Sequence, residues 1–203
     1  MSDLIKINTE QQVKNSFAQQ IPVFDLVNEN HPLLRQKLDE FDFSKPPVDP
    51  NAFASSLVET CKKYNGYGLS ANQCGFKHRV FVMGAGDEYV AMFNPKVLEY
   101  SPDGAMMVEG CLSFSLLGLR ISRASWVVVE YQDFTGTKHQ KRFEGLSARC
   151  FLHELDHMDG IVFTQRAKPL ALKSGVDKRN KLLRQVKKNA SKHLAAKKLT
   201  NGK

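Results

Sequence analysis

Five residues in the last third of the chain, His153-Glu154-Leu155-Asp156-His157, constrain its fold more than any other stretch. On an α-helix the i to i+4 spacing places His153 and His157 one turn apart on one face, so both imidazoles can bind one divalent cation. Glu154 is adjacent, from where its carboxylate can act as a base toward water beside the metal. The alternative is a helix whose histidines are only packed or solvated. The pattern favours a catalytic metal site.

A catalytic metal site of this kind needs three protein ligands and one open position, so a third ligand must come from elsewhere in the chain. One class of metalloproteases has a histidine three residues after the position of Gly160, but Phe163 stands there. Another class uses a later glutamate, and no glutamate follows Glu154. His193 is the only later histidine, and it lies in a lysine-rich tail. The third ligand is therefore expected upstream, which disfavours the common metalloprotease patterns.

The upstream thiol candidates for this ligand are Cys61, Cys74, Cys111 and Cys150. Cys111 follows a glycine, which allows the backbone to approach a ligand closely, and a thiolate suits a divalent transition metal. Cys150 competes with it, because positions 150, 153 and 157 fall within about 60° of one another on a helical wheel. A small buried thiol without a metal is the alternative for each cysteine. Spacing alone leaves the choice open.

A third segment, residues 66–73, is rich in glycine and ends in the primary amide of Gln73. Its sequence, Gly-Tyr-Gly-Leu-Ser-Ala-Asn-Gln, is followed by Glu-Gly-Cys-Leu-Ser at residues 109–113 and then by the histidine pentapeptide. With these three motifs in this order and at similar separations, the chain resembles the peptide deformylases. The resemblance extends from about Ile21 to the end of the predicted C-terminal helix, and three ordered motifs are far more specific than one.

The resemblance implies a role for each motif. The implied metal ligands are Cys111, His153 and His157, with water as the fourth ligand. Glu154 would be the general base and then the general acid. The side-chain amide of Gln73 and the backbone N–H of Leu112 would donate hydrogen bonds to the charge that develops on the formyl oxygen. The reaction implied is hydrolysis of the formyl group from the N-terminal formylmethionine of a new polypeptide, with release of formate.

The metal and two other functions stay open at this point. The family implies ferrous iron, which nickel, cobalt or zinc can replace, whereas the ligand set alone suits zinc. One alternative function is a metallopeptidase or amidase that acts on another N-acyl peptide. The other is a basic RNA-binding protein with a vestigial metal site. The RNA-binding alternative explains Gln73, Cys111 and Glu154 poorly, because a binding protein needs none of these groups.

The same family places a set of residues around the substrate. These residues are Gly66, Tyr67, Gly68, Glu109, Gly110, Leu146, Arg149 and Cys150. Segments 66–69 and 109–110 would flank the substrate backbone and pair with it like an added strand, without reading later side chains. Arg149 departs from the family, which usually has an aliphatic wall of the methionine pocket there. We expect Arg149 to reshape that pocket or to contact the peptide; the alternative is an arginine that extends into solvent.

The rest of the sequence predicts an α+β fold with one catalytic domain, residues 1–168, and a basic helical extension, residues 169–203. Antiparallel or mixed sheets would pack around the central histidine helix, which we expect over residues 146–158, with Phe151, Leu155 and Met158 facing the sheets. An N-terminal helix is predicted over residues 50–64, capped by Asp49. The β-rich runs are residues 79–83, 89–93, 125–131 and 138–143, with a hairpin turn at 133–136.

Positive charge is concentrated at the end of the chain. Residues 165–203 contain 13 lysines and arginines and one acid, Asp177, for a net charge of +12, whereas the preceding residues carry −4. The pattern predicts a basic helix over about 177–199 with a narrow apolar stripe. By resemblance to the family, this helix would bind ribosomal RNA and place the active site near emerging chains, in a salt-sensitive manner. A solvated helix with a frayed end is the alternative.

The sequence also indicates where the protein acts. No stretch approaches the roughly 18 apolar residues that would mark a membrane-spanning helix. Residues 1–20 contain acids and no arginine, so we expect neither a signal peptide nor a transit peptide. Four cysteines in unrelated contexts do not form a disulfide framework. We therefore predict a cytoplasmic protein without membrane contact.

Overall fold

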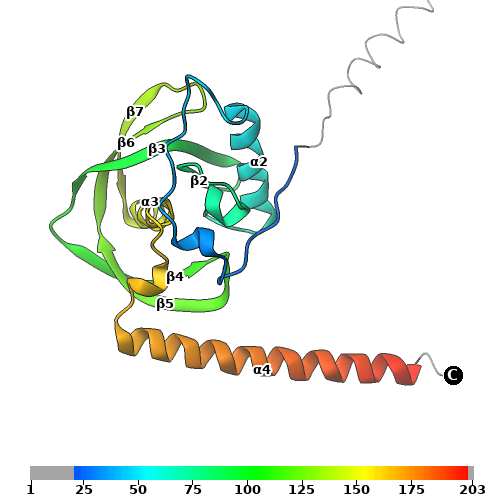
Figure 1. The fold of residues 1–203 in the computed structure, drawn as a ribbon. Helices are drawn as coiled ribbons and strands as arrows, with labels where there is room; N and C mark the ends of the chain where they lie inside the picture. Colours follow the sequence, from blue (N-terminus) through cyan, green and yellow to red (C-terminus); the bar gives the residue numbers. More distant parts are fainter. Residues whose placement is uncertain (1–20, 201–203) are drawn as a thin grey trace, which may run out of the picture.

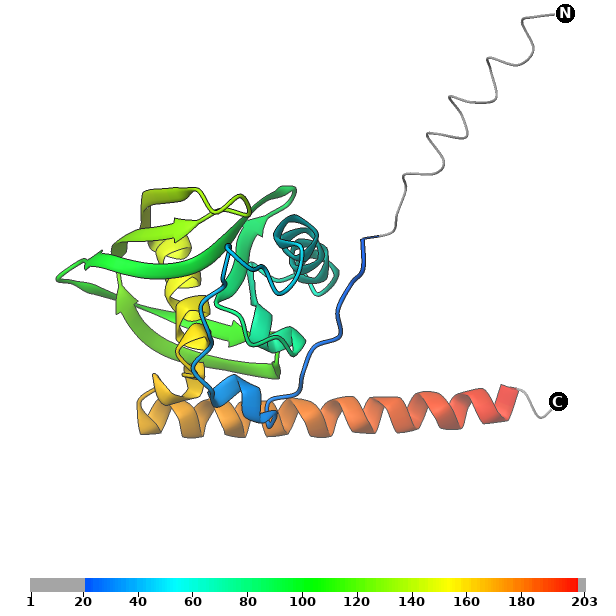
Figure 2. The same ribbon diagram turned by 45° about the horizontal axis from the view of Figure 1, so that its top comes forward.

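The computed structural model describes residues 21–200, with side chains through residue 191 (Figure 1). The prediction for residues 1–20 lies outside the described residues. The architecture is α+β, which confirms the predicted class. Helix α3 (Gly145–Met158) lies between a five-stranded sheet and a two-stranded sheet, and helix α4 (Pro169–Thr200) runs beneath the smaller sheet and past the body of the protein (Figures 1 and 2).

Seven strands and three short 3-10 helices accompany the helices in the part of the chain that the structure describes. The strands are β1 (Gly68–Ser70), β2 (Val80–Ala85), β3 (Glu88–Tyr100), β4 (Gly104–Cys111), β5 (Phe114–Ala124), β6 (Trp126–Gln132) and β7 (Lys138–Glu144). The 3-10 helices are η1 (Pro32–Arg35), η2 (Ala71–Cys74) and η3 (Phe163–Gln165). The larger sheet has the order β1-β2-β3-β6-β7, the smaller is β4-β5, and every pairing between these strands is antiparallel. β1 and β4 therefore each keep one unpaired edge within the described sheets.

Helix α2 (Pro50–Lys63) confirms the predicted N-terminal helix. The Asp49 carboxylate caps it by accepting a hydrogen bond from the Ala52 N–H at 2.6 Å, and Pro50 occupies the first helical position, where no N–H is needed. Phe53, Leu57 and Cys61 are buried against strands of the large sheet. The helix thus covers the face of this sheet that α3 does not occupy.

Helix α3 is buried along nearly its whole length, and it is the central helix that the sequence predicted. Phe151, Leu155 and Met158 pack into one core cluster with side chains of β2, β6 and β7. The Phe151 ring meets those of Phe81 and Phe143 at centroid distances of 5.3 and 5.8 Å. Because both sheets pack on this helix, its polar residues also face protein rather than water, and each of them needs a buried partner.

The β4–β5 hairpin was not predicted, although it carries the cysteine motif. Strand β4 is mostly exposed, and its glycines interrupt the apolar alternation that would indicate a strand. In β5 the alternation is clear in the structure, with Leu117, Leu119 and Ile121 buried, but Arg123 continues it on the inner face. β3 also extends beyond its predicted end, through Pro95, where the ladder with β6 shifts register.

Helix α4 begins at Pro169, earlier than the predicted 177. Its first turns pack on β5: Leu172 joins a core cluster, and a Cβ atom on Gly175 would lie 2.4 Å from Leu119 Cδ2 and 2.9 Å from the Gly118 carbonyl oxygen. Arg179 pairs with Glu29 at 2.7 Å. The division into residues 1–168 and 169–203 stays a prediction, but the start of α4 packs on the body of the protein. Within the described part of the chain, no helix is long and apolar enough to cross a bilayer.

Candidate active site

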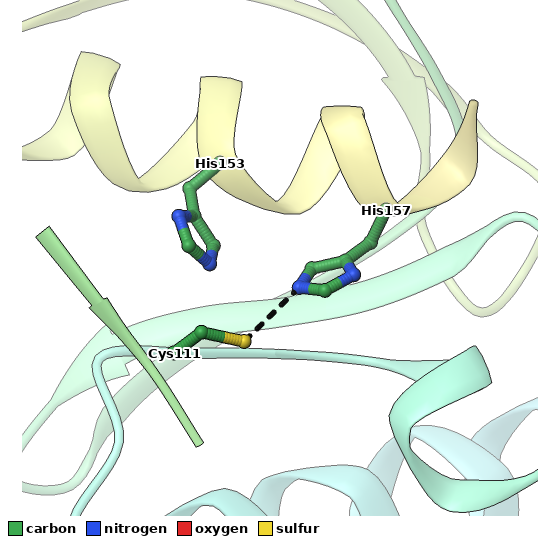
Figure 3. Close-up of side chains that lie close together, drawn as sticks. All are labelled: Cys111, His153 and His157. Carbon is green, nitrogen blue, oxygen red and sulfur yellow. Dashed lines mark hydrogen bonds between the residues drawn. The ribbon is translucent and has the colours of Figure 1, made fainter. Parts of the chain in front are cut away.

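Cys111, His153 and His157 converge between the end of β4 and helix α3 (Figure 3). Their potential ligand atoms all lie within 4.8 Å of one another, and Cys111 Sγ is 3.4 Å from His157 Nε2. Both imidazoles extend from the same side of α3 toward the thiol. One thiolate and two imidazoles form a donor set that suits a divalent transition metal, so the residues present fit the metal that the sequence implied.

The structure separates the two cysteines that spacing alone left in competition, in favour of Cys111, the ligand that the resemblance implied. Among the described residues, the cluster of potential ligands contains Cys111 and does not contain Cys150. The Cys150 thiol donates instead to the Tyr67 carbonyl oxygen at 3.3 Å, and desolvation raises its pKa well above its ordinary value. All four cysteines are free, in agreement with the prediction that they form no disulfide framework.

The Glu109 carboxylate orients His153. Glu109 Oε2 lies 3.1 Å from His153 Nδ1, which places the hydrogen of the imidazole on Nδ1 and leaves Nε2 for a metal. Burial opposes ionisation of Glu109, but hydrogen bonds from His153 and Arg123 lower the pKa of its carboxyl to about 2. Burial likewise opposes protonation of His153, but Cys111 and Glu109 raise its pKa to about 10 in the absence of a metal. Glu109 is thus a charged partner of a candidate metal ligand.

Two arginines hold this carboxylate. Arg123 donates to both oxygens of Glu109, from Nε at 2.6 Å and from Nη2 at 2.9 Å, and also reaches Asp156 at 2.8 Å. Arg149 donates to Glu109 Oε1 at 2.5 Å and is only 6% exposed. The alternative of an Arg149 that extends into solvent is therefore wrong. Asp156 pairs further with Arg166, so a chain of ion pairs leads from the His153 partner to the start of α4.

Glu154 is buried beside the metal ligands, 3% exposed, and its Oε2 has no hydrogen-bond partner among the described residues. Desolvation is the main cause that raises the pKa of this carboxyl to about 7. Strand β1 runs so close to α3 that only glycine fits at position 68, because a Cβ atom there would collide with Glu154 Oε1. A carboxyl with one unpartnered oxygen and with a pKa near neutrality is suited to accept and return a proton.

The orientation of the Gln73 amide follows from its neighbours. Gln73 Oε1 accepts hydrogen bonds from the backbone N–H of Ser70 at 3.0 Å and from its hydroxyl at 3.1 Å. Since the Ser70 N–H can only donate, Gln73 Nε2 must point the other way, and it lies 3.4 Å from Cys111 Sγ and 3.3 Å from Ser113 Oγ. The amide therefore presents donor hydrogens at the metal cluster.

One cavity of about 720 Å³ collects nearly all the predicted site residues. Those that line it are Gly66, Tyr67, Gly68, Gln73, Glu109, Gly110, Cys111, Leu112, Leu146, Arg149, Cys150, His153 and Glu154. Tyr67 and Leu146 are 75% and 70% exposed, so these two apolar side chains stand at the mouth. His157 completes the cluster but does not line the cavity. The glycine loop, the cysteine motif and the histidine helix thus form one site.

The residues that sequence reasoning missed include two groups that shape the site. Residues 83–85 of β2 line the cavity because β2 pairs with β1, a partnership that no local pattern reveals. Arg123 and Asp156, which support Glu109, were also missed. One signal was present: Arg123 continues the buried alternation of β5, and an arginine on a core face requires a buried acid.

The chain is similar to peptide deformylases in sequence. The polypeptide deformylase family matches residues 23–173. The chain is 42% identical over 113 residues to the peptide deformylase of Thermotoga neapolitana, which covers 56% of this chain and 69% of that protein. It is 34% identical over 146 residues to the peptide deformylase of Desulforudis audaxviator, which covers 71% of this chain and 94% of that protein. Residues 174–203, most of α4, lie outside the family match.

The fold is also similar to those of solved peptide deformylases. The crystal structure of peptide deformylase from Thermotoga maritima has a TM-score of 0.67 and 33% sequence identity, and the match covers 72% of this chain and 99% of that one. A peptide deformylase from Synechococcus elongatus, in complex with actinonin, has a TM-score of 0.72 at 29% identity, with 78% and 87% of the two chains covered. Sequence and structure therefore point to the same family.

Proposed function

This chain belongs to the polypeptide deformylase family, and on that premise we propose that it hydrolyses the formyl group from the N-terminal formylmethionine of nascent polypeptides. The observation that carries the proposal is that Cys111 and His153 line one cavity with the buried carboxyl of Glu154 and the amide of Gln73, while His157 lies beside them and completes the ligand cluster. A peptidase or amidase, or an RNA-binding protein with a vestigial metal site, explains this set and the family match less well.

We propose that Cys111, His153 and His157 hold one divalent metal, ferrous iron in the cell, with nickel, cobalt or zinc as replacements. Support comes from the donor set and from the Glu109 hydrogen bond, which leaves His153 Nε2 free. A metal held there would lower the pKa of water toward about 7 and would polarise a carbonyl oxygen. The remaining chemistry falls to side chains and backbone groups of this chain.

Glu154 moves the proton in this mechanism. Its carboxylate takes a proton from the water that attacks the formyl carbon, and then delivers it to the departing amine as the C–N bond breaks and formate leaves. With a pKa raised by burial to about 7, the carboxyl can both accept and release that proton near neutral pH. Gln73 Nε2 and the Leu112 N–H stabilise the negative charge on the formyl oxygen, which is a donor pair of the kind found in other acyl-transfer sites.

The substrate would bind between two unpaired strand edges. Gly66 to Gly68, which lead into β1, line one side of the cavity, and Glu109 and Gly110 of β4 line another. A peptide laid along these edges gains backbone hydrogen bonds that do not depend on its later side chains, as an enzyme for many nascent chains requires. Leu146, Arg149 and Cys150 line the part of the cavity on α3, where the methionine side chain would lie.

Comparison of three methionyl peptides tests this function: one N-formylated, one N-acetylated and one with a free amine. We expect the anaerobically purified protein with about one metal per chain to release formate and free amine in equal amounts from the first peptide only. Actinonin, the ligand in the Synechococcus elongatus structure, should inhibit the reaction. Cleavage of the acetylated peptide or of an internal peptide bond would favour the amidase or peptidase alternative, and no turnover with metal bound would contradict both.

We further propose that the protein acts in the cytoplasm at the ribosome and that α4 binds ribosomal RNA. The later part of α4 extends past the body of the protein (Figure 2), and its side chains from residue 180 to residue 191 are mostly exposed. Lysines and arginines dominate this part, with Leu182 and Val186 exposed among them. A projecting basic helix can approach RNA phosphates without disturbing the catalytic cavity, and counterion release would make the binding salt-sensitive.

Charge reversal tests the ribosome contact better than truncation, because removing all of α4 would also uncover the β5 surface under Leu172 and Gly175. We expect Lys181→Glu, Arg184→Glu and Lys188→Glu together to weaken co-sedimentation with ribosomes at low salt by about tenfold or more, while deformylation of free peptides is unchanged. The matched control reverses three exposed cations on β7, Lys138, Lys141 and Arg142. Equal binding by both triple variants and the parent would refute the contact.

A further inference from the structure

Arg149 and His153 lie one turn apart on the same face of α3, and both contact one carboxylate, that of Glu109. We propose that Arg149 is a positioning residue that holds Glu109 in the orientation that fixes the His153 ring. The inference rests on the proposed function, because it takes His153 to be a metal ligand. It assigns to Arg149 an effect on the metal site rather than a contact with the substrate.

The Glu109 carboxylate accepts four hydrogen bonds. Oε1 accepts from Arg123 Nε at 2.6 Å and from Arg149 Nη1 at 2.5 Å, while Oε2 accepts from Arg123 Nη2 at 2.9 Å and faces His153 Nδ1 at 3.1 Å. Arg123 belongs to β5 and grips both oxygens from the sheet side. Arg149 adds a donor from α3 itself, so the carboxylate is fixed to the same helix that carries His153. Glu109 thereby fixes the orientation of the His153 ring relative to α3 as well as to the small sheet.

The Arg149 guanidinium is itself anchored at two further points. Nη1 donates to the Ile121 carbonyl oxygen at 3.1 Å and Nη2 donates to the Ala105 carbonyl oxygen at 2.5 Å. These carbonyls belong to β5 and β4, so one side chain joins the helix to both strands of the small sheet. Both terminal nitrogens are engaged with protein acceptors. Arg149 therefore acts on the site through Glu109, although it also lines the cavity.

Charge balance gives a second reason for this residue. Arg123 donates to Asp156 as well as to Glu109, so its single positive charge is shared between two buried carboxylates, and Asp156 has a second cation in Arg166. Arg149 supplies another positive charge directly at Glu109. Loss of one partner from a buried ion pair leaves the other charge poorly compensated, and the remaining group then reorients or admits water. Without Arg149, Glu109 would hold His153 less firmly.

Binding of Co2+ is a direct measure of this effect. We expect Arg149→Met to weaken Co2+ binding by about 10- to 100-fold, measured by competition with a chelator, and to change the visible absorption spectrum of the bound ion. Arg149→Lys keeps one donor for Glu109 and should lie between Arg149→Met and the parent. With formylmethionyl peptides, kcat should fall by a larger factor than KM changes, because the loss acts on the metal site and not on the backbone pairing that holds the peptide.

Two controls separate positioning from a general loss of structure. Arg120→Met removes an exposed arginine from β5, the strand that also carries Arg123, and should leave Co2+ affinity unchanged. In a Glu109→Gln background, Arg149→Met should add little further loss, because Arg149 acts through the Glu109 carboxylate. Equal Co2+ affinity and spectra in the parent and both Arg149 variants would overturn the inference, as would an undiminished effect of Arg149→Met in the Glu109→Gln background. A parent chain that binds no Co2+ would instead refute the proposed function.

Discussion

Glu154→Gln should lower kcat for formylated peptides by about 10²- to 10⁴-fold while one metal stays bound per chain. Glutamine has nearly the shape of glutamate, so the close contact with Gly68 and the packing of α3 should persist. What is lost is the group that accepts a proton from water and returns it to the amine. The measurement is steady-state formate release, together with elemental analysis of the same sample.

Glu144→Gln is the matched control for this change. Glu144 is exposed, lies just before α3 and pairs with Arg142 at the surface, so its neutralisation should change kcat by less than about twofold. If Glu154→Gln kept more than a tenth of the parent activity with metal bound, Glu154 would not be the proton carrier. If it lost its metal, the activity would not report on proton transfer.

Cys111→Ala and Cys150→Ala should behave in opposite ways. Loss of a residue that only hydrogen-bonds to a metal ligand typically weakens metal binding about 10- to 100-fold, and loss of a ligand itself should weaken it more. Cys111→Ala should therefore be purified with little metal and without activity. Cys150→Ala removes a thiol whose hydrogen-bond partner is the Tyr67 carbonyl oxygen, and it should bind about one metal per chain. Metal content by elemental analysis and the thiolate absorption band of the Co2+ form distinguish the two variants.

The outcome that would contradict this assignment is a Cys150→Ala protein without metal and a Cys111→Ala protein with it. Both variants should first be shown to be folded by thermal unfolding, because Cys150 packs against the α3 core cluster. A thiol-to-methyl change in a packed site costs roughly 1 kcal/mol of stability and should not by itself unfold the protein. Metal content can then be interpreted as a property of the site.

Much of the site was predictable because its chemistry depends on short spacings. The helix with His153 and His157 follows from an i to i+4 pattern, and the cap of α2 follows from Asp49 before Pro50. The choice between Cys111 and Cys150 could not be made from periodicity, since Cys150 lies on the same helical face as the histidines. The family resemblance favoured Cys111, and the ligand cluster at the end of β4 agrees with it. Strand β4 itself was not predicted, because its exposed, glycine-containing sequence lacks the alternation of a strand.

The role of Arg149 was unpredictable for a related reason. Its partner Glu109 precedes it by 40 residues, and their contact depends on how β4 and β5 pair and then pack on α3. A sequence reveals an arginine on a helix face, but only the tertiary structure reveals whether that arginine reaches water or a buried acid. The expectation of a pocket-facing Arg149 named the correct side of the helix, while the solvent-exposed alternative was wrong.

The separation of the metal ligands along the chain has a consequence for the order of folding. Cys111 and His157 are 46 residues apart, and three strands that belong to two different sheets are formed by the residues between them. The two histidines can come together as soon as one helical turn forms, but the thiol joins them only after a long loop has closed. During refolding, tight capture of a metal would therefore mark the docking of both sheets on α3, a late event, and not the formation of that helix.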